Sequence, residues 1–233
     1  METWLPSPHH ITAVFKLARG GAEPDVDRMG GVMEQTKAAG RGAVRTVFLD
    51  RDGVINEKAP EGDYVRRVED LKLLEGAATA IARLNRAGIR VVVVSNQRGV
   101  ALGLYSKEDV SAVHAALVRM LAADGARLDG FYFCPHDAGT CHCRKPQPGL
   151  FEQARADFPG ITAAESVMIG DSLSDVEFGR GLGMRTIFIE GPVETQRAGA
   201  ERARQLADAR ARSLAHAVET LLNCALSRNV EAP

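Results

Sequence analysis

The stretch of sequence that decides the fold is FLDRDGVIN, residues 48–56. Four mainly apolar residues, Thr46–Leu49, lead directly into Asp50 and Asp52, and Gly53 follows. Such a run predicts a buried β-strand, and two carboxylates at its end place negative charge where a sheet normally keeps apolar side chains. Like charges this close are costly unless a cation or a reaction requires them. The segment therefore predicts a metal ion, acid–base chemistry, or both.

The chain after this stretch alternates apolar strands with helices. Strands are expected at residues 45–50, 89–95, 130–134, 166–170 and 185–189. Helices are expected at residues 77–87, from Ser106 as N-cap to about 123, at 149–158, after Ser172 and at 213–223. Apolar strands separated by helices indicate βαβ units with right-handed crossovers. The sequence therefore predicts an α/β fold with a doubly wound parallel sheet, in which ligands bind beyond the carboxyl ends of the strands.

The two ends of the chain depart from this pattern. Residues 1–44 are rich in proline and glycine and are expected to be a flexible extension, with a short helix near residues 11–18. One domain is expected over residues 45–224, followed by a C-terminal tail at 225–233. The arginine-rich stretch 197–212 is expected to be a solvated helix.

The composition limits the classes of function. The 233 residues carry a net charge of −1 and only 5% aromatic residues. A protein that binds nucleic acid, such as a DNA 3′-phosphatase, would be expected to show a basic groove with stacking aromatic residues, so this class is disfavoured. The longest apolar run, at residues 89–94, is far too short to span a bilayer, and no secretory signal is recognisable. We therefore expect no nucleic-acid or membrane partners. A cytoplasmic location and a monomeric state are further expectations.

Side chains that can bind a metal ion or a phosphoryl group follow the predicted strands. Carboxylate oxygens suit Mg²⁺, whereas a lysine and a hydroxyl suit the oxygens of a phosphoryl group. A single Asp at a strand end is more often a turn former or a helix cap, but several such residues at successive strand ends predict one shared site. The residues expected at this rim are Asp50, Asp52, Ser95, Asn96, Arg144, Lys145, Asp171 and Asp175.

Three of the four cysteines gather within ten residues, which is typical of a metal site rather than of a disulfide framework. Cys134 and His136, with Cys141 and Cys143, supply the ligands of a closed tetrahedral Zn²⁺ site. Such a site is structural because it has no open position. Free thiols or a disulfide are the alternative interpretation, and His142 is a competing ligand.

Four separated motifs resemble those of the haloacid dehalogenase (HAD) superfamily. They are Asp50–Val54, Ser95–Asn96, Lys145 and Gly170–Asp175, and the resemblance spans about Val44 to Leu222. More narrowly, the chain is similar to the branch that contains D-glycero-D-manno-heptose 1,7-bisphosphate phosphatases and histidinol-phosphatases. That likeness rests on Phe48–Asn56, Ser95–Val100 and the cysteine cluster.

The resemblance implies a Mg²⁺-dependent phosphatase that works through an aspartyl-phosphate. Asp50 would be the nucleophile, and Asp52 would protonate the leaving group and then activate water. Mg²⁺ would be held by Asp50, the backbone carbonyl of Asp52, and Asp171. The substrate would be bound by Ser95, Asn96, Arg144 and Lys145. Asp175 would be either an outer carboxylate that supports the metal ligands or an ordinary residue of a helix first turn.

The segments between the motifs leave no room for a large cap domain, so an open site with specificity in its loops is expected. The expected substrate is a phosphorylated small molecule, foremost the C7 phosphate of a heptose 1,7-bisphosphate, with histidinol phosphate as the alternative.

Arg144 and Arg98 are candidates to meet a second anionic group. Arg51 is expected to point away from the site and to pair with a nearby acid. A non-catalytic zinc-containing binding protein is the hypothesis from a different class.

Overall fold

The computed structural model describes residues 43–60, 62–192 and 196–229. The helix expected near residues 11–18, and nearly all of the extension expected over residues 1–44, lie outside the described residues.

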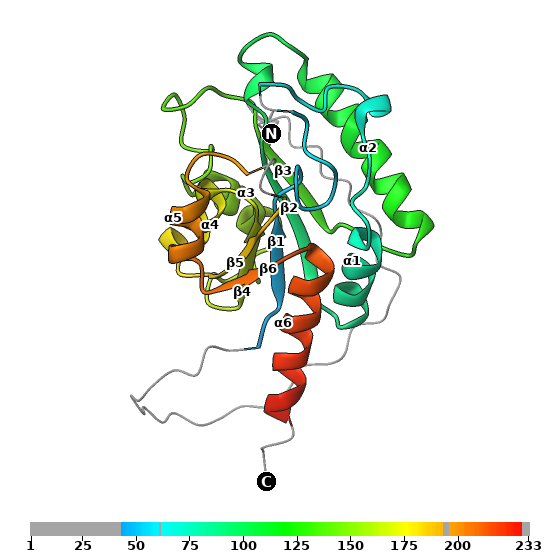
Figure 1. Cartoon of the computed structure of the whole chain (residues 1–233), viewed down its shortest axis with the longest axis vertical. Helices are drawn as coiled ribbons and strands as arrows, with labels where there is room; N and C mark the ends of the chain where they lie inside the picture. Colours follow the sequence, from blue (N-terminus) through cyan, green and yellow to red (C-terminus); the bar gives the residue numbers. More distant parts are fainter. Residues whose placement is uncertain (1–42, 61, 193–195, 230–233) are drawn as a thin grey trace, which may run out of the picture.

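The described part of the chain builds one six-stranded sheet with parallel pairing throughout. Its order is β3-β2-β1-β4-β5-β6, which confirms the doubly wound parallel sheet (Figure 1). The strands are β1 (Thr46–Leu49), β2 (Arg90–Asn96), β3 (Gly130–Cys134), β4 (Ser166–Gly170), β5 (Arg185–Ile189) and β6 (Ala209–Ala211).

Helices cover both faces of the sheet. In Figure 1, α1 (Ala77–Arg86), α2 (Lys107–Ala123) and α6 (Leu214–Asn229) lie on one side of it. On the other side lie α3 (Gly149–Asp157), α4 (Leu173–Leu182) and α5 (Ala200–Leu206). The start of α2 is the predicted one, because the Ser106 hydroxyl accepts from the Asp109 backbone N–H while Asp109 reaches back to the Ser106 N–H.

The central strand β1 is buried on both faces, which explains its unbroken apolar sequence. Val47 and Leu49 belong to the apolar cluster beneath α1 and α6, while Phe48 packs in the cluster beneath α3 and α4. Full burial of such a side chain contributes about 1.5–3 kcal/mol. The strand that carries the two aspartates is therefore anchored by packing on both sides.

The site is positioned by the reversal of strand order at β1. Strands β2 and β3, which follow β1 in the sequence, lie on one side of it, and β4, β5 and β6 lie on the opposite side. Leu49 is level with Val93 of β2 and Ile169 of β4, so the residues that follow these strands emerge together. In open α/β sheets, this reversal leaves a crevice at the carboxyl ends of the strands, and Asp50 and Asp171 border it.

Two predictions about the C-terminal part are wrong in detail. The stretch 197–212 is not one solvated helix: it contains α5 and the edge strand β6, whose Ala211 is buried. Three residues, Ala-Arg-Ala, are too short for a strand pattern to stand out from a helical one. The last helix, α6, continues to Asn229 instead of ending at residue 223.

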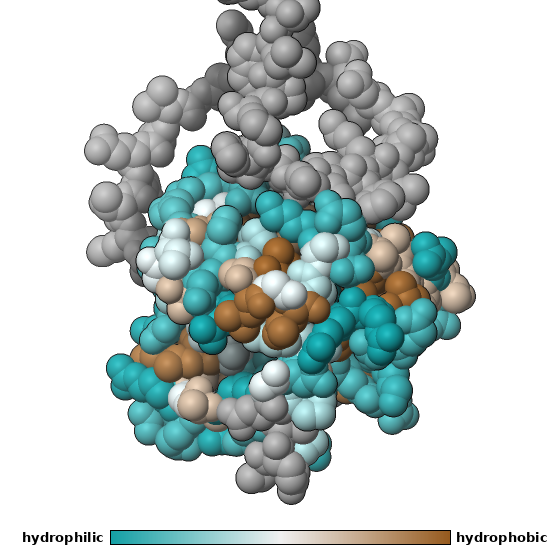
Figure 2. Space-filling model, turned by 90° about the horizontal axis from the view of Figure 1, so that it is seen from above, coloured by the Kyte–Doolittle hydropathy of each residue, from teal (hydrophilic) through white to brown (hydrophobic). Residues whose placement is uncertain are grey.

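Loops rather than a separate domain surround the crevice. Between β1 and α1 the described chain forms isolated bridges at Asn56 and one short 3-10 turn, Val68–Asp70. A second 3-10 turn, Arg98–Val100, follows β2. Seen from above, the described surface is mainly hydrophilic, with hydrophobic residues gathered near its centre (Figure 2). None of the helices in the described ranges is both long enough and apolar enough to cross a membrane.

Two side-chain truncations on α2 are expected to lower the unfolding free energy by different amounts. Leu117 is completely buried, so Leu117→Ala is expected to lower the unfolding free energy by about 2–5 kcal/mol. Met120 is 37% exposed, so Met120→Ala is expected to cost less than about 1 kcal/mol. Urea denaturation of both variants measures the difference, and equal losses would contradict this description of the core.

Candidate active site

A buried lysine joins two carboxylates at the strand reversal. Lys145, on the loop between β3 and α3, places its Nζ 2.8 Å from Asp50 Oδ1 and 2.6 Å from Asp175 Oδ1. Its third contact is the carbonyl oxygen of Val94 on β2, at 2.6 Å. The contacts to Asp50 and Val94 are hydrogen bonds and the contact to Asp175 is an ion pair, so three groups hold the ammonium in place. The structure thus brings Asp50 and Lys145 together, as expected from the sequence.

The carboxylates and the lysine of this group shift one another's pKa values. Burial raises the pKa of Asp50 to about 7, with Asp175 and Asp171 adding to the rise and Lys145 opposing it. Burial also raises the pKa of Asp171 to about 6, against the influence of Lys58. Burial alone would lower the pKa of Lys145, but Asp175 and Asp50 raise it above its ordinary value. A site with more carboxylates than buried cations favours the binding of a further cation.

The donor set suits a hard divalent cation. Ligand oxygens of Asp50, Asp171 and Asp175 lie within 4.8 Å of one another, and Asp171 Oδ1 is buried without a hydrogen-bond partner among the described residues. Gly53, in the left-handed region at φ +87°, leaves the necessary space, because a Cβ there would lie 2.0 Å from Asp171 Oδ2. Three carboxylates whose oxygens lie this close together suit Mg²⁺, which prefers oxygen ligands.

Asp175 is a residue of the first turn of α4, and its role as an outer carboxylate that supports the metal ligands stays a prediction. Its Oδ2 accepts from the Ser172 backbone N–H at 3.0 Å and caps α4, as a first-turn residue does. Its Oδ1 contacts the Lys145 ammonium. Asp175 therefore both starts the helix and holds the lysine.

Asp52 lies in a separate hydrogen-bonded group. Its carboxylate accepts from Arg51 Nη2 at 2.9 Å, from Asn56 Nδ2 at 2.9 Å and from Gln97 Nε2 at 3.2 Å. Burial works to raise the pKa of Asp52, but the Arg51 charge and these hydrogen bonds outweigh it and lower the pKa below the ordinary value. Asp50 and Asp52 therefore have pKa shifts of opposite sign, although they stand only two residues apart in the sequence.

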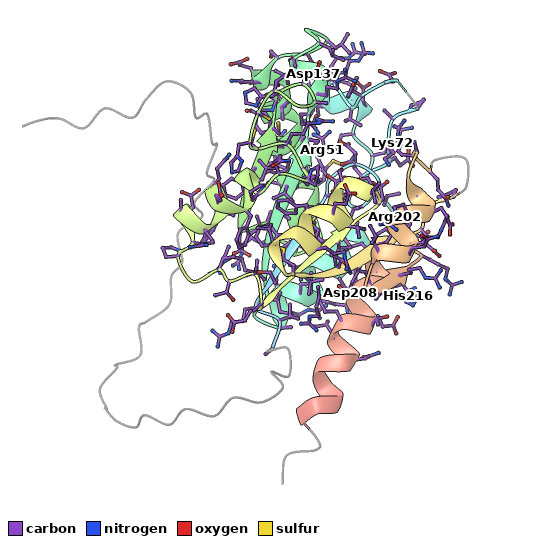
Figure 3. The ribbon with its side chains drawn as sticks, turned by 90° about the vertical axis from the view of Figure 1, so that its left-hand side faces the viewer. Arg51, Lys72, Asp137, Arg202, Asp208 and His216 are labelled. Carbon is purple, nitrogen blue, oxygen red and sulfur yellow. The ribbon has the colours of Figure 1, made fainter. Side chains whose placement is uncertain are left out.

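The expectation that Arg51 points away from the site is wrong, although its pairing with a nearby acid is confirmed. The guanidinium is 1% exposed and binds the Asp52 carboxylate. Figure 3 labels Arg51 in the interior of the described chain. The expectation assumed that the alternation of a strand continues through Arg51. The strand ends at Leu49, and the chain then turns, with Ile55 N–H donating to the Arg51 carbonyl at 2.9 Å.

The residues after β2 support the other groups. Ser95 is buried, and its Oγ accepts from Gln97 Nε2 at 2.7 Å, which leaves the hydroxyl hydrogen available for donation. The Asn96 side chain binds both backbone groups of Lys145, accepting from its N–H at 3.0 Å and donating to its carbonyl at 3.1 Å. Asn96 therefore positions the lysine loop within this arrangement.

The four predicted zinc ligands come together in the loop after β3. Cys134 Sγ lies 3.5 Å from Cys141 Sγ and 3.7 Å from His136 Nδ1, and Cys143 Sγ lies 3.2 Å from that nitrogen. The three cysteines are free of disulfides. The competing candidate, His142, contacts Glu152 instead, at 3.1 Å. Three sulfurs and one imidazole nitrogen at these separations fit a tetrahedral metal site.

The two arginines proposed for a second anionic group differ. Arg144 Nη1 is buried without a hydrogen-bond partner among the described residues, so it keeps a donor for an anion. Arg98 is exposed, and its Nε lies 2.6 Å from Asp137 on the cysteine loop. Arg98 therefore ties the loop after β2 to the loop after β3, the latter marked by Asp137 at the end of the molecule in Figure 3.

Sequence reasoning missed three residues of the site. Lys58 forms an ion pair with Asp171, while Asn56 and Gln97 bind Asp52, and no role was predicted for any of the three. Asn56 and Gln97 belong to the stretches Phe48–Asn56 and Ser95–Val100 that carry the family resemblance, whereas Lys58 lies outside them. Lys58 also lines a cleft of about 910 Å³ formed mainly by the loop at residues 57–72, with Tyr105 on its wall. Of the site residues named above, Lys58 is the one that lines this cleft, and its ion pair with Asp171 links the cleft to the carboxylates.

Comparison with known proteins agrees with this geometry. A model of the HAD-hydrolase-like family matches residues 142–218. A D-glycero-alpha-D-manno-heptose-1,7-bisphosphate 7-phosphatase of Mycobacterium tuberculosis is 46% identical over 132 residues, which are 56% of this chain and 69% of that protein. The corresponding beta-heptose enzyme of Neisseria meningitidis is 37% identical over 58% of this chain and 71% of that protein.

The chain belongs to the HAD-like hydrolases that include these phosphatases. A solved structure of a D,D-heptose 1,7-bisphosphate phosphatase from B. bronchiseptica, complexed with magnesium and phosphate, superimposes with a TM-score of 0.68 at 30% identity. The superposition covers 77% of this chain and 99% of that one. As a HAD-like phosphatase, the protein hydrolyses phosphate monoesters, and magnesium dependence is typical of its family.

The shifted pKa of Asp50 predicts how stability depends on pH without Mg²⁺. Between its unfolded pKa of 3.8 and its folded pKa of about 7, the folded state holds the proton more tightly than the unfolded chain. The Asp50 contribution to stability is therefore present at low pH and is lost as the pH rises through this window. In Mg²⁺-free buffer, Asp50→Asn is expected to gain stability relative to the wild type from pH 4 to pH 8.

Thermal denaturation across this pH range measures the effect. Addition of Mg²⁺ at pH 8 is the control, because it is expected to raise the Tm of the wild type more than that of Asp50→Asn. A constant difference between the two proteins at all pH values would contradict the assignment.

Proposed function

We propose that this phosphatase removes the C7 phosphate of a D-glycero-D-manno-heptose 1,7-bisphosphate. The observation that carries the proposal is the pairing of Asp50 with the buried Lys145 at the strand reversal, beside Asp171 and Asp52. The relatives whose names state this activity add the substrate. Within the described chain, loops and two short 3-10 turns rather than a cap domain surround the carboxylates, which is compatible with a small phosphorylated sugar as substrate.

In the proposed reaction, Asp50 attacks the phosphorus of the substrate and the ester oxygen leaves. An aspartyl-phosphate forms, and water hydrolyses it in a second step. Lys145 holds Asp50 Oδ1 at 2.8 Å and thereby orients the carboxylate. Bound Mg²⁺ supplies charge neutralisation for the phosphoryl oxygens. Its proposed protein ligands are Asp50, Asp171 and the backbone carbonyl of Asp52.

Asp52 is the proposed general acid and base. It gives a proton to the departing alcohol, and the carboxylate that remains then takes a proton from the attacking water. Its three hydrogen-bond donors, Arg51, Asn56 and Gln97, keep it in place. They also stabilise the charged form that the second step requires.

Substrate binding is proposed to use polar and cationic groups around the carboxylates. The hydroxyl hydrogen of Ser95 and the Lys145 ammonium face phosphoryl oxygens, and Asn96 supports the lysine. Arg144, with its unpartnered Nη1, is the proposed contact for the second phosphate. A bisphosphate would then be bound at both ends.

We also propose that Cys134, His136, Cys141 and Cys143 hold a structural Zn²⁺. Hydrogen bonds from Cys143, His136 and Cys141 lower the pKa of the Cys134 thiol to about 5 despite its burial, so a thiolate is available for the metal. Arg144 and Lys145 follow Cys143 directly, so the metal would hold the backbone that carries both cations. With four protein ligands, this ion would take no part in the reaction.

Phosphate release from a panel of compounds tests the proposed substrate. The panel holds both anomers of D-glycero-D-manno-heptose 1,7-bisphosphate, histidinol phosphate and simple hexose phosphates. A heptose bisphosphate is expected to give the highest kcat/KM, and preference for histidinol phosphate would overturn the substrate assignment.

Asp50→Asn tests the nucleophile in the same assay. The variant is expected to lose at least about 10³-fold in kcat, because the covalent step needs the carboxylate. The matched control is Asp124→Asn at the exposed C-terminal end of α2, which is expected to keep wild-type activity. Full activity of Asp50→Asn would contradict the mechanism.

Metal analysis tests the zinc site. The purified protein is expected to contain about one Zn²⁺ per chain, and His136→Ala is expected to lose most of it. His142→Ala is the matched control and is expected to retain the metal, because His142 contacts Glu152 outside the cluster. Zinc loss in His142→Ala with retention in His136→Ala would reverse the ligand assignment.

A further inference from the structure

We infer that His114, on α2, is a positioning residue for the general acid Asp52 and acts on it through the buried guanidinium of Arg51. The inference rests on the proposed function of Asp52. It adds a residue that lies 62 positions from Asp52 in the sequence, in none of the motifs that carry the site.

The path from His114 to Asp52 is a continuous chain of hydrogen bonds. Arg51 Nε and Nη2 donate to Asp52 Oδ1 at 3.2 and 2.9 Å, and Nη2 also reaches Oδ2 at 2.9 Å. The remaining nitrogen of the fork, Arg51 Nη1, lies 3.3 Å from His114 Nε2. A guanidinium is planar and rigid, so an acceptor at Nη1 restrains the orientation of the donors that hold Asp52.

The imidazole of His114 is itself held firmly. Its ring centroid lies 3.2 Å from that of Phe131, and the Phe133 ring meets it edge-on at 5.7 Å. His114 is only 6% exposed, and Arg51 is 1% exposed. Because both groups are buried, a lost hydrogen bond between them would not be replaced easily by water.

The contact with Arg51 determines which ring nitrogen of His114 carries the proton. A guanidinium only donates hydrogen bonds, so His114 Nε2 must accept and the proton of the neutral ring must be on Nδ1. Burial, together with the charge of Arg51, lowers the pKa of His114 well below its ordinary value, in agreement with a neutral ring. The ring thus serves as a permanent acceptor for Arg51.

A purely structural role for His114 makes a different prediction from a positioning role. A general acid matters most when the leaving group is a poor one, such as the alkoxide of a sugar. A p-nitrophenolate leaves without much help from a proton. Loss of the Asp52 orientation should therefore slow sugar phosphates selectively, whereas general damage to the fold should slow both substrates alike.

The experiment compares kcat/KM, which reports the steps up to departure of the alcohol, for the preferred sugar phosphate and for p-nitrophenyl phosphate. His114→Leu, which keeps an apolar side chain but removes the acceptor, is expected to lose about 10–100-fold on the sugar phosphate. On p-nitrophenyl phosphate the loss is expected to stay within about 3-fold. His114→Gln, whose Oε1 can accept from Arg51, is expected to recover most of the loss.

Val118→Ala is the matched control, since Val118 lies one turn further along α2, beside the same small cavity as His114. It is expected to change neither rate by more than about 2-fold. Equal losses on both substrates in His114→Leu, or no recovery in His114→Gln, would overturn the inference.

Two further measurements separate this inference from the proposed function. Asp52→Asn should show the same selective loss as His114→Leu, to a larger extent; if it stays fully active, the proposed role of Asp52 fails. ¹⁵N NMR of the histidine rings tests the geometry independently of activity. A neutral ring protonated on Nδ1 is expected for His114, and a proton on Nε2 would overturn the inference even in an active enzyme.

Discussion

The site depends on the way one buried ammonium group offsets several buried carboxylates. Lys145 contacts Asp50 and Asp175 within 2.8 Å, while Asp171 pairs with Lys58. Two buried charges of one sign would be too costly on their own, and removing one partner of such a group leaves an uncompensated charge. The remaining excess of negative charge is the physical reason that the crevice suits a further cation, and with it a phosphoryl group.

The rest of the fold holds that lysine in place. Parallel strands that are buried on both faces bring Asp50, Val94 and Asp171 to one edge of the sheet. Asn96 binds the backbone of Lys145, and the four-residue sulfur and imidazole cluster immediately precedes Arg144. The cluster therefore lies where a bound metal would stiffen the loop that supplies the cations of the site.

Much of this arrangement was predictable from the sequence, because strong local signals coincide with the observed elements. Strands β1 to β5 are continuous apolar runs, and the CxH and CxC pairs revealed the cluster. The short edge strand β6 carries no such signal. The direction of Arg51 was not predicted, because the chain turns after Leu49 and Gly53 then adopts a positive φ. Lys58 was not predicted, because its contact with Asp171 depends on the path of a loop.

The account rests most directly on the claim that Asp50 becomes phosphorylated. Rapid quenching during turnover, followed by borohydride reduction, converts an aspartyl-phosphate into homoserine, which peptide mass spectrometry locates in the chain. Homoserine is expected at position 50, dependent on substrate and Mg²⁺ and absent from Asp50→Asn. Unmodified Asp50 during steady phosphate release, or homoserine at another aspartate, would contradict it.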